Sequence, residues 1–362
     1  MLINNETNNK YSQCGVEDLV HGASAEADTG SSVVDKGLSA GVVATIGFFD
    51  GVHLGHRYLI DKVMEMAHAH AQQSMVITFD RHPREVLQSD YQPQMLTTLN
   101  TKLRLLRETG VGCVEVLHFT RELAALSARE FMAQVLKERL GVTTLVIGYD
   151  HRFGHNRAEG FDDYVRYGKE LGIEVVQNSE LTMHISSSNP SSFAEKLGKH
   201  VSSSTIRRLL KEGNVSRANL FLDRPYTITG CVTHGFAEGR KMGFPTANLD
   251  TTGYPLLIPA NGVYGVWVKI GCADAVMGKC EVPNLAGWLP AMLNIGMRPT
   301  FDGSTTTIEA NIFDFNDDIY GQPMTIAFCF RLRNEQRFDS IEALENQLHK
   351  DRKEIEKMLT AF

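Results

Sequence analysis

The chain has 362 residues, of which 43% are hydrophobic, 22% charged and 8% aromatic; this composition is typical of a globular protein and excludes collagen, a coiled coil or a wholly disordered chain. Its 36 basic and 43 acidic residues give a net charge of −7, so no global field favours nucleic acid or anionic lipid. The length predicts two or three domains, each large enough to bury its own core.

Neither the apolar segments nor the cysteines point to export. No apolar run approaches the ~18 residues of a transmembrane helix, and the polar stretch Met1–Asn9 has no hydrophobic signal core. The six cysteines are scattered without a Cys-x-x-Cys pair, which disfavours a disulfide framework or a zinc site. We therefore expect a protein of the reducing cytoplasm, with no membrane and no nucleic acid as partner.

Residues 1–41 are rich in Asn, Ser, Gly and acidic residues and are predicted to form a poorly structured lead. From there to residue 177, short apolar runs alternate with amphipathic segments. This alternation predicts an α/β domain with a parallel sheet and right-handed crossovers, whose ligands bind at the carboxyl ends of the strands. The predicted strands are 42–47, 74–79, 113–117, 144–148 and 173–177, and the predicted helices are 55–72, 98–109, 127–140 and 161–172.

Residues 178–204 interrupt this pattern, and the run SSSNPSS within them has the composition of a loop. Helices are predicted to follow at 204–213 and 215–222. Beyond Pro225, apolar runs separated by Gly and Pro turns predict an antiparallel barrel or sandwich. Its predicted strands are 226–232, 262–270, 291–294, 305–313 and 325–332.

Asp339 and Glu342 are typical of a helix start and predict a closing helix at about 340–360. Its core-facing residues are expected to be Ile341, Leu344, Leu348 and Ile355. The domain boundary is predicted at 219–225. The chain then divides into the lead 1–41, the α/β domain 42–218 and a mainly antiparallel β domain 219–362.

The segment Gly47–His56 (GFFDGVHLGH) follows a predicted strand and opens a predicted helix. Glycines allow a ligand to approach the backbone closely, and a helix N-terminus favours an anion. His53 and His56 can face one phosphate and stabilise charge on a transferring phosphoryl group. The alternative is a solvent-facing histidine pair at a helix start. The candidate ATP or phosphate contacts here are Gly47, Phe49, Asp50, Gly51 and Gly55.

This segment resembles the H-x-G-H nucleotidyltransferases, and within them the adenylyltransferase half of the bacterial bifunctional riboflavin kinase/FAD synthetase family. Three further segments match that family in order: TFDRHP at 78–83, GYDHRFG at 148–154 and SSSTIR at 202–207. Ser204 stands where the family usually has threonine. The resemblance implies a Rossmann-like nucleotidyltransferase domain.

The same resemblance implies site roles for the later segments. Ser202, Ser203 and Ser204 would bind phosphate, and Arg207 would hold the triphosphate as a catalytic residue. Asp150 would place nucleotide or flavin. Taken without the family, the serines are N-cap candidates and Asp150 is a turn residue.

Residues 235–248 (GFAEGRKMGFPTAN) are the second strong signal. Glycines and two cations in one run suit a loop that wraps phosphates, although a glycine-rich hairpin has the same composition. The run resembles the riboflavin kinase signature of the family, as do NIGMRPTF at 294–301 and IEANIFDFNDDIY at 308–320. The resemblance implies magnesium and nucleotide contacts for Thr246 and Asn248. The candidate phosphate contacts are Gly235, Gly239, Arg240, Lys241 and Gly243.

Glu309 lies on a predicted strand beside apolar residues, where a carboxylate can accept the proton of an attacking hydroxyl. Its alternatives are an exposed strand residue or a structural salt bridge. Asn311 stands where the family frequently has histidine. Arg298 and Arg337 are implied as flavin contacts, the latter because its surroundings resemble the flavin-side segment of the family.

The resemblance covers residues 42–362 and implies a bifunctional enzyme of flavin-cofactor synthesis that needs Mg²⁺. The β-barrel riboflavin kinase domain would phosphorylate riboflavin to FMN with ATP. The N-terminal domain would adenylylate FMN with a second ATP, giving FAD and pyrophosphate. The alternatives are a nucleotidyltransferase for another phosphate substrate and a non-catalytic flavin-binding sensor. The stretches 181–201 and 271–289 exceed the expected family lengths, and the sequence assigns no oligomeric state.

Overall fold

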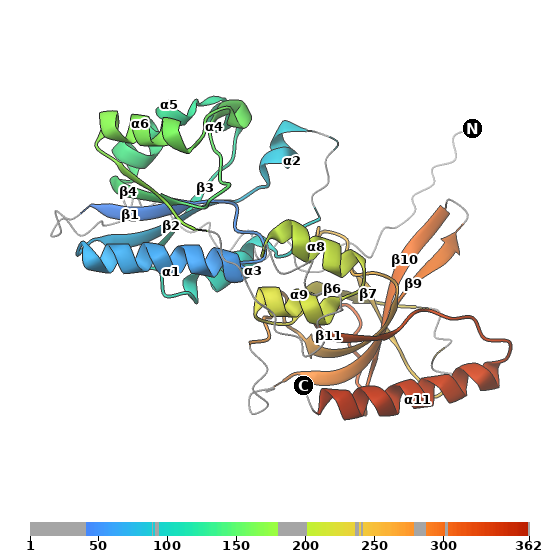
Figure 1. The fold of residues 1–362 in the computed structure, drawn as a ribbon. Coiled ribbons are helices and arrows are strands. Elements are labelled where there is room, and N and C mark those ends of the chain that lie inside the picture. Colours follow the sequence, from blue (N-terminus) through green and yellow to red (C-terminus); the bar gives the residue numbers. More distant parts are fainter. Residues whose placement is uncertain are drawn as a thin grey trace, which may run out of the picture.

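The computed structural model describes residues 41–88, 90, 94–179, 201–235, 239, 242–278, 287–300 and 303–360. The predicted lead up to residue 40, the stretch 181–200 and the cations Arg240 and Lys241 lie outside the described residues. Figure 1 shows a helix-flanked sheet and a barrel, with a pair of helices between them. None of the described helices is both long and apolar enough to span a membrane.

The first domain is built on a five-stranded parallel sheet with the order β3-β2-β1-β4-β5. Parallel strands covered on both faces are buried, and β1 and β4 are almost wholly so. The strand order reverses between β1 and β4, which is where open α/β sheets bind ligands. All five predicted strands are confirmed, as β1 (Val42–Ile46), β2 (Gln73–Phe79), β3 (Cys113–Leu117), β4 (Val142–Ile147) and β5 (Glu174–Gln177).

Helices cover both faces of this sheet (Figure 1). On one face, α1 (Leu54–Ala69) packs against β1, β2 and β4. The opposite face carries α5 (Ala128–Glu130), which continues into the π-helix η1 (Phe131–Arg139), and α6 (Phe161–Leu171). The remaining helical segments are α2 (Pro83–Leu87), α3 (Leu99–Arg107), α4 (Arg121–Ala125) and the 3₁₀ turn η2 (His155–Arg157). The short helices α2 and α4 were not among the predicted elements.

The second domain is a closed antiparallel barrel with the order β10-β7-β6-β11-β8-β9, which decides between barrel and sandwich. The strand β7 was not predicted, because its sequence ANLD lacks the β-branched and aromatic residues that favour strands. It pairs with both β6 and β10, so the barrel closes through it. The strands are β6 (Tyr226–Thr233), β7 (Ala247–Asp250), β8 (Gly262–Ile270), β9 (Leu289–Thr300), β10 (Gly303–Ile312) and β11 (Pro323–Arg333).

The helices α8 (Ser203–Lys211) and α9 (Val215–Leu222) lie between the sheet and the barrel (Figure 1). Their apolar residues, Ile206 and Phe221 among them, belong to the same buried cluster as the barrel residue Phe328. α9 contacts β6 and β11 directly. The barrel core therefore extends into this helix pair.

The closing helix α11 (Ile341–Leu359) lies along the outside of the barrel (Figure 1). Ile355 is buried against barrel side chains and Leu348 packs beside it. Ile341, in contrast, is 70% exposed, so its predicted core position is wrong. The buried residues of α11 all lie in its C-terminal half, and the first turn does not reach the core.

The start of α11 agrees with the helix start predicted at about residue 340. Ser340 caps the helix, since its hydroxyl accepts a hydrogen bond from the backbone N–H of Ala343. Asp339 precedes this cap, and Glu342 lies in the first turn, where a carboxylate interacts favourably with the helix dipole.

Candidate active sites

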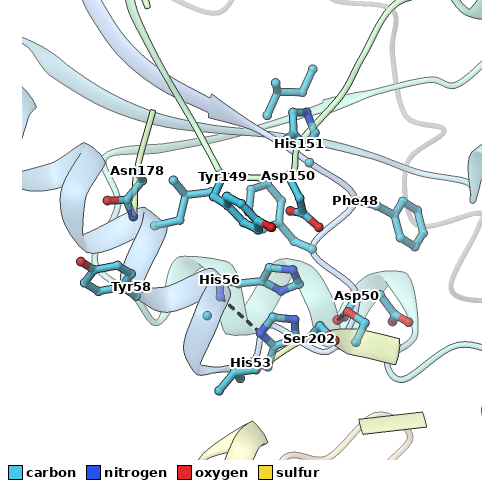
Figure 2. A pocket seen from close by; sticks show the side chains of 18 of the residues that line it. Phe48, Asp50, His53, His56, Tyr58, Tyr149, Asp150, His151, Asn178 and Ser202 are labelled. Atoms are coloured by element: carbon cyan, nitrogen blue, oxygen red, sulfur yellow. Dashed lines mark hydrogen bonds between the residues drawn. The ribbon is translucent and has the colours of Figure 1, made fainter. Parts of the chain in front are cut away.

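A cavity of about 500 Å³ lies at the carboxyl edge of the parallel sheet. Its wall combines the turn after β1, the loop after β4, the end of β5 and the start of α8. Figure 2 shows His53, His56 and Asp150 around it. Of the predicted residues, Gly51 is buried and Ser204 exposed, and neither is part of the lining. The predicted residues that do line it are Gly47, Phe49, Asp50, His53, Gly55, His56, Asp150, Ser202, Ser203 and Arg207.

The turn between β1 and α1 has an unusual backbone. Phe49, Gly51 and Val52 have φ values of 56°, 86° and 41°, in the left-handed region that residues with side chains rarely adopt. Such a conformation costs on the order of 1–3 kcal/mol per non-glycine residue and persists only where the surroundings impose it. The side chains of Phe49 and Val52 are buried in a core cluster. Packing therefore helps to force the turn that leads into His53.

His53 is the N-cap of α1, and its Nδ1 accepts a hydrogen bond from the backbone N–H of His56 at 3.3 Å. The two rings are stacked with their centroids 3.6 Å apart. Because Nδ1 of His53 is an acceptor, its ring proton is assigned to Nε2. Nδ1 of His56 is buried and has no hydrogen-bond partner among the described residues. No described residue therefore uses the hydrogen-bonding capacity of this nitrogen.

Burial keeps both imidazoles neutral at pH 7. Burial, and then the charges of Arg224 and Arg207, lower the pKa of His53 to about 3. The pKa of His56 is lowered well below its ordinary value by burial, then by His53 and Lys102. The positive charge in this region comes from the nearby arginines and lysine, and it favours an anionic ligand.

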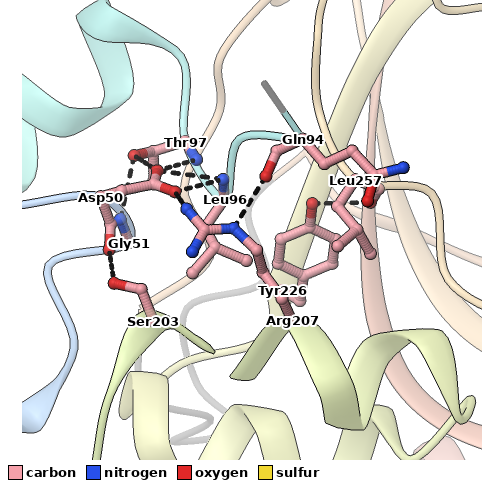
Figure 3. Close-up of polar contacts among 9 residues, drawn as sticks. All are labelled: Asp50, Gly51, Gln94, Leu96, Thr97, Ser203, Arg207, Tyr226 and Leu257. Carbon is pink, nitrogen blue, oxygen red and sulfur yellow. Dashed lines mark hydrogen bonds and ion pairs between the residues drawn. The ribbon is translucent and has the colours of Figure 1, made fainter. Parts of the chain in front are cut away.

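The Asp50 carboxylate ties three segments together (Figure 3). It accepts hydrogen bonds from the backbone N–H groups of Leu96 and Thr97 at 3.0 and 3.1 Å and pairs with the Arg207 guanidinium. Burial raises the pKa of Asp50, while Arg207 and the two amides favour its ionised form. The carboxylate is thus engaged by protein donors. We infer that Asp50 orients Arg207 rather than a phosphate.

The N-terminus of α8 meets the cavity through two serines. Ser202 is the N-cap, and its hydroxyl accepts a hydrogen bond from the backbone N–H of Thr205 at 3.2 Å. The hydroxyl of Ser203 donates to the carbonyl oxygen of Asp50 at 2.9 Å. Ser202 is thus explained as a helix cap, as its residue type alone suggested. The N-terminus of α8 points into the cavity, where a helix N-terminus favours an anion.

Sequence reasoning missed several residues in and around this cavity. Lys102, in the middle of α3, is buried; its Nζ donates to the carbonyl of Phe79 at 2.7 Å and lies 4.1 Å from the centroid of the Phe48 ring. Burial lowers the pKa of Lys102 to about 8. No sequence signal distinguishes it from a surface lysine. Asn178 lines the cavity directly after β5, and this position at a strand end could have identified it.

His82 and His151 also line the cavity, and both lie within segments that the sequence analysis matched to the family. Burial is the main cause that lowers the pKa of each to about 4. Nε2 of His151 is buried without a hydrogen-bond partner among the described residues. His151 is therefore a second histidine of the cavity wall with an unpartnered ring nitrogen.

The predicted residues of the second site meet on the outer face of the barrel. Glu309 on β10 lies opposite Asn248 on β7 and Asn294 on β9, and directly opposed residues share one face of a sheet. The neighbours Ile308 and Ala310 are buried in the barrel core. Since side chains alternate along a strand, Glu309 and the two asparagines face outward.

A second cavity, of about 400 Å³, lies on the core-facing side of β10, where Ala310 and Ile312 contribute to its wall. Gly235 and Thr246 line it, but Glu309 and Asn248 do not. A Cβ at Gly235 would overlap the Asn248 amide, so a side chain at this position would require that amide to move. The other lining residues are Val232, Pro245, Ala247, Ala310, Ile312, Phe315, Asn316, Asp317, Asp318, Ile319 and Tyr320.

The glycine-rich loop is described only in part. The backbone N–H of Phe244 donates to the carbonyl of Gly239 at 2.8 Å, and a Cβ at Gly239 would overlap the Phe244 carbonyl oxygen. Gly243 has a φ of 77°, which favours glycine. Both glycines are therefore explained by loop geometry, whatever they contact in a complex.

Asn311, which replaces a frequent histidine, is buried, and its Nδ2 donates to the carbonyl of Pro245 at 2.8 Å. It thus fixes the backbone next to Thr246. Arg337 is exposed between β11 and α11. Arg298 lies in β9, and its side chain is outside the described residues.

The paired histidines, the strained turn and the α8 N-terminus meet at a strand-order reversal, as the resemblance to the H-x-G-H nucleotidyltransferases implies for the first domain. Comparison with known proteins extends this to both domains. The chain matches the FAD synthetase family over residues 35–190 and the riboflavin kinase family over residues 222–359. It belongs to the family of bifunctional riboflavin kinase/FMN adenylyltransferases, as the individual relatives show.

The bifunctional riboflavin kinase/FMN adenylyltransferase of Escherichia coli (strain K12) is 36% identical over 311 residues, which cover 86% of this chain and 90% of that protein. The protein of the same name from Bacillus subtilis (strain 168) is 33% identical over 316 residues, with coverage of 86% and 90%. Among solved structures, one described as a macrolide-efflux protein from Streptococcus pneumoniae is 32% identical, with a TM-score of 0.72 over 88% of this chain and 94% of that one.

Proposed function

We propose that this chain converts riboflavin to FMN in its barrel domain and FMN to FAD in its α/β domain, with ATP as the co-substrate of both steps. Membership of the family supports the pair of reactions. The single structural observation that carries the site assignment is the His56 side chain, which lines a cavity at the strand-order reversal and whose buried Nδ1 has no partner among the described residues.

In the adenylyl transfer, the phosphate of FMN attacks the α-phosphorus of ATP, and pyrophosphate leaves. The cavity can stabilise the charge that develops on the transferring group in three ways. Nε2–H of His53 donates a hydrogen bond, Arg207 supplies a fixed positive charge, and the α8 N-terminus supplies backbone N–H groups. Because the imidazoles are neutral, they act through hydrogen bonds rather than through net charge.

In the kinase reaction, the ribityl hydroxyl of riboflavin attacks the γ-phosphorus of ATP, and ADP leaves. Glu309 is the outward-facing carboxylate on the strand between Asn248 and Asn294. We assign it as the base that accepts the hydroxyl proton. The cavity lined by Thr246 and Gly235 is the candidate site for ATP, with Arg240, Lys241 and Gly243 supporting its phosphates.

The donor chemistry of the barrel site fits Mg²⁺. The Thr246 hydroxyl and the Asn248 amide oxygen are hard oxygen donors. The Gly235 backbone passes so close to the Asn248 amide that it forms a cradle which a Cβ would fill. No group of three or more His, Cys, Asp or Glu that could hold a metal occurs among the described residues, so phosphate oxygens would complete the shell. When bound, Mg²⁺ neutralises charge on the transferring phosphoryl group.

The direct test is to separate the products formed from riboflavin, ATP and Mg²⁺ by chromatography. We expect FMN first and FAD later, with ADP and pyrophosphate as co-products. If the protein converts supplied FMN to FAD but does not convert riboflavin, its function is limited to adenylyl transfer. If it binds flavin but forms no product, it is a flavin-binding sensor rather than an enzyme. Omission of Mg²⁺, with chelator present, should stop both steps.

We propose that the two activities belong to separate domains. The packing of α8 and α9 on the barrel determines which fragments test this division. Both helices contribute to the barrel core, although the first of them carries Arg207. A fragment of residues 201–362 should make FMN but no FAD. A fragment of residues 223–362 lacks both helices, exposes their buried partners, and should be less stable to heat. Equal stability of the two fragments would argue against a shared core.

Two further assignments complete the proposal. The scattered cysteines support a cytoplasmic location, and the net charge of −7 gives no support for a nucleic-acid partner. Asp150, which lines the first cavity, is proposed to contact flavin or nucleotide, and Arg298 and Arg337 are proposed on the flavin side of the barrel.

A further inference from the structure

The strained turn of the first site is held in part by residues outside its own sheet. The carbonyl oxygen of Asp50 accepts a hydrogen bond from Ser203 at 2.9 Å. The next carbonyl, that of Gly51, accepts one from Nη2 of Arg224 at 2.8 Å. Ser203 lies on α8, and Arg224 lies in the connection between α9 and β6. Both supports thus come from the segment that packs on the barrel.

Arg224 is buried although its guanidinium is charged. It is 7% exposed, and its other described hydrogen bond runs from Nη1 to the carbonyl of Leu222 at 3.0 Å. Burial lowers the pKa of Arg224 to about 10, so it stays protonated at neutral pH. Burying a cation is costly unless its donors are satisfied, and the Gly51 carbonyl satisfies one of them.

The backbone that carries Arg224 is anchored to the barrel. Its N–H donates to the carbonyl of Asn219 at 3.2 Å. The Asn219 side chain accepts from the N–H of Tyr226 at 2.8 Å and donates to the carbonyl of Phe328 on β11 at 2.7 Å. The guanidinium therefore links a fixed point of the barrel to the turn.

A second link joins the barrel to the opposite side of the same turn. Met95 forms a β-bridge with Leu256, and the adjoining Leu96 and Thr97 hold the Asp50 carboxylate. Figure 3 shows Leu96 and Thr97 against the Asp50 carboxylate, beside Arg207. The turn is thus held from two sides by segments that are attached to the barrel.

We propose that Arg224 is a positioning residue for adenylyl transfer, acting through the Gly51 carbonyl on the orientation of His53 and His56. The barrel domain then contributes to FAD formation without touching FMN or ATP at that site. The proposal rests on adenylyl transfer at the histidine cavity. A left-handed turn that relaxes by a fraction of an ångström would move His53, which follows Gly51 by two residues.

The test compares Arg224→Met and Arg224→Lys in the full chain, with Arg217→Met on the half-exposed side of α9 as the matched control. FAD formation from supplied FMN and FMN formation from riboflavin are measured separately. Misplacement by about 1 Å costs up to ~10²-fold in rate. We expect Arg224→Met to lower the kcat of adenylylation by about 10- to 100-fold, with both KM values nearly unchanged.

Arg224→Lys keeps the charge and one donor, and should recover part of this kcat. Kinase activity should be normal in all three variants, and Arg217→Met should match the wild type. An unchanged adenylylation kcat in Arg224→Met would overturn the proposal. So would a rise in KM alone, which indicates binding, or an equal loss in Arg217→Met.

If Arg224→Met also loses kinase activity, the protein has failed to fold, and Arg224→Lys decides. Reduced adenylylation with normal kinase activity in that variant supports the proposal, whereas wild-type adenylylation contradicts it. A wild-type chain that makes no FAD would refute the proposed function instead, so the two failures are distinguishable.

Discussion

The two candidate sites are built in opposite ways. The adenylyltransferase site gathers residues from positions 47–56, 148–151 and 202–207, and buries two imidazoles between them. The kinase site places Asn248, Glu309 and Asn294 abreast on neighbouring strands, with Glu309 half-buried. The adenylyltransferase site depends on contacts between segments that are far apart along the chain. The kinase site depends on how neighbouring strands of one sheet are paired.

This difference predicts how each activity responds to change. A barrel strand that stays in register keeps its outward side chains aligned, so the kinase site should tolerate changes in the α/β domain. The strained turn at 49–52 persists only while its surroundings hold it. Adenylylation should therefore be sensitive to changes in both domains, and kinase activity to changes in the barrel alone.

The largest expected effect follows from Glu309→Gln, which keeps the side-chain shape but removes the basic oxygen. Riboflavin phosphorylation should fall by roughly 10²–10⁴-fold, the usual range for general-base catalysis. FAD formation from supplied FMN should persist, because Glu309 lies on the barrel face and does not line the histidine cavity. Both half-reactions are measured on one purified protein.

A matched control for this variant is Asp314→Asn. Asp314 lies just beyond β10, is exposed, and pairs with Arg352 on α11. It should leave both reactions within a few-fold of the wild type. Normal phosphorylation by Glu309→Gln would remove Glu309 from the role of base, and a parallel loss of both reactions would indicate misfolding.

The next effect concerns His56→Ala. It removes the buried ring nitrogen that lacks a described partner and the ring that stacks on His53. Loss of one preorganised stabilising group typically costs ~10²–10³-fold in rate. FAD formation should fall by that amount while FMN formation stays normal. The control is His68→Ala, at an exposed position on the same helix. Near-normal adenylylation by His56→Ala at saturating substrate would show that His56 does not stabilise the transition state.

Sequence periodicity was sufficient for the elements that bury a regular face. All five parallel strands and most long helices lie close to their predicted ranges, because apolar spacing reports burial directly. The same reasoning missed β7, whose ANLD sequence has little strand preference and is held by pairing with β6 and β10. It also misplaced Ile341, because spacing along a helix does not show where the helix leaves the core.

Site residues were predictable by position but not always by role. The sequence placed Asp50 among the phosphate contacts, whereas its carboxylate binds the amides of Leu96 and Thr97 and the side chain of Arg207. These partners lie 46, 47 and 157 residues away along the chain. No local pattern specifies such contacts. Arg224 and Lys102 were missed for the same reason, since only the tertiary fold buries them.

The smallest expected effect tests whether the buried histidines make the α/β domain the acid-sensitive half. The pKa values of His53 and His151 are lowered by burial to about 3 and about 4, whereas an unfolded histidine has a pKa near ~6.5. Above that value neither state binds the proton. Below it, only the unfolded chain does, so stability falls as the pH falls from about 6.5 toward the folded pKa values.

Between pH 7 and pH 5.5, each of these two histidines should lower the free energy of unfolding by about 1.3 kcal/mol, or about 2.5 kcal/mol together. Pulsed hydrogen exchange across a urea series resolves β1 peptides from β8 peptides. On going from pH 7 to pH 5.5, the urea concentration at which half of the molecules are unfolded should drop more for β1 than for β8. His151→Gln should remove part of the difference, since the pKa values of His53, His56 and His82 are lowered as well, and His68→Gln should remove none of it. Equal shifts of the two urea midpoints would show that the buried histidines do not make the α/β domain more sensitive to acid. The two sites would then differ only in the contacts that hold them in place.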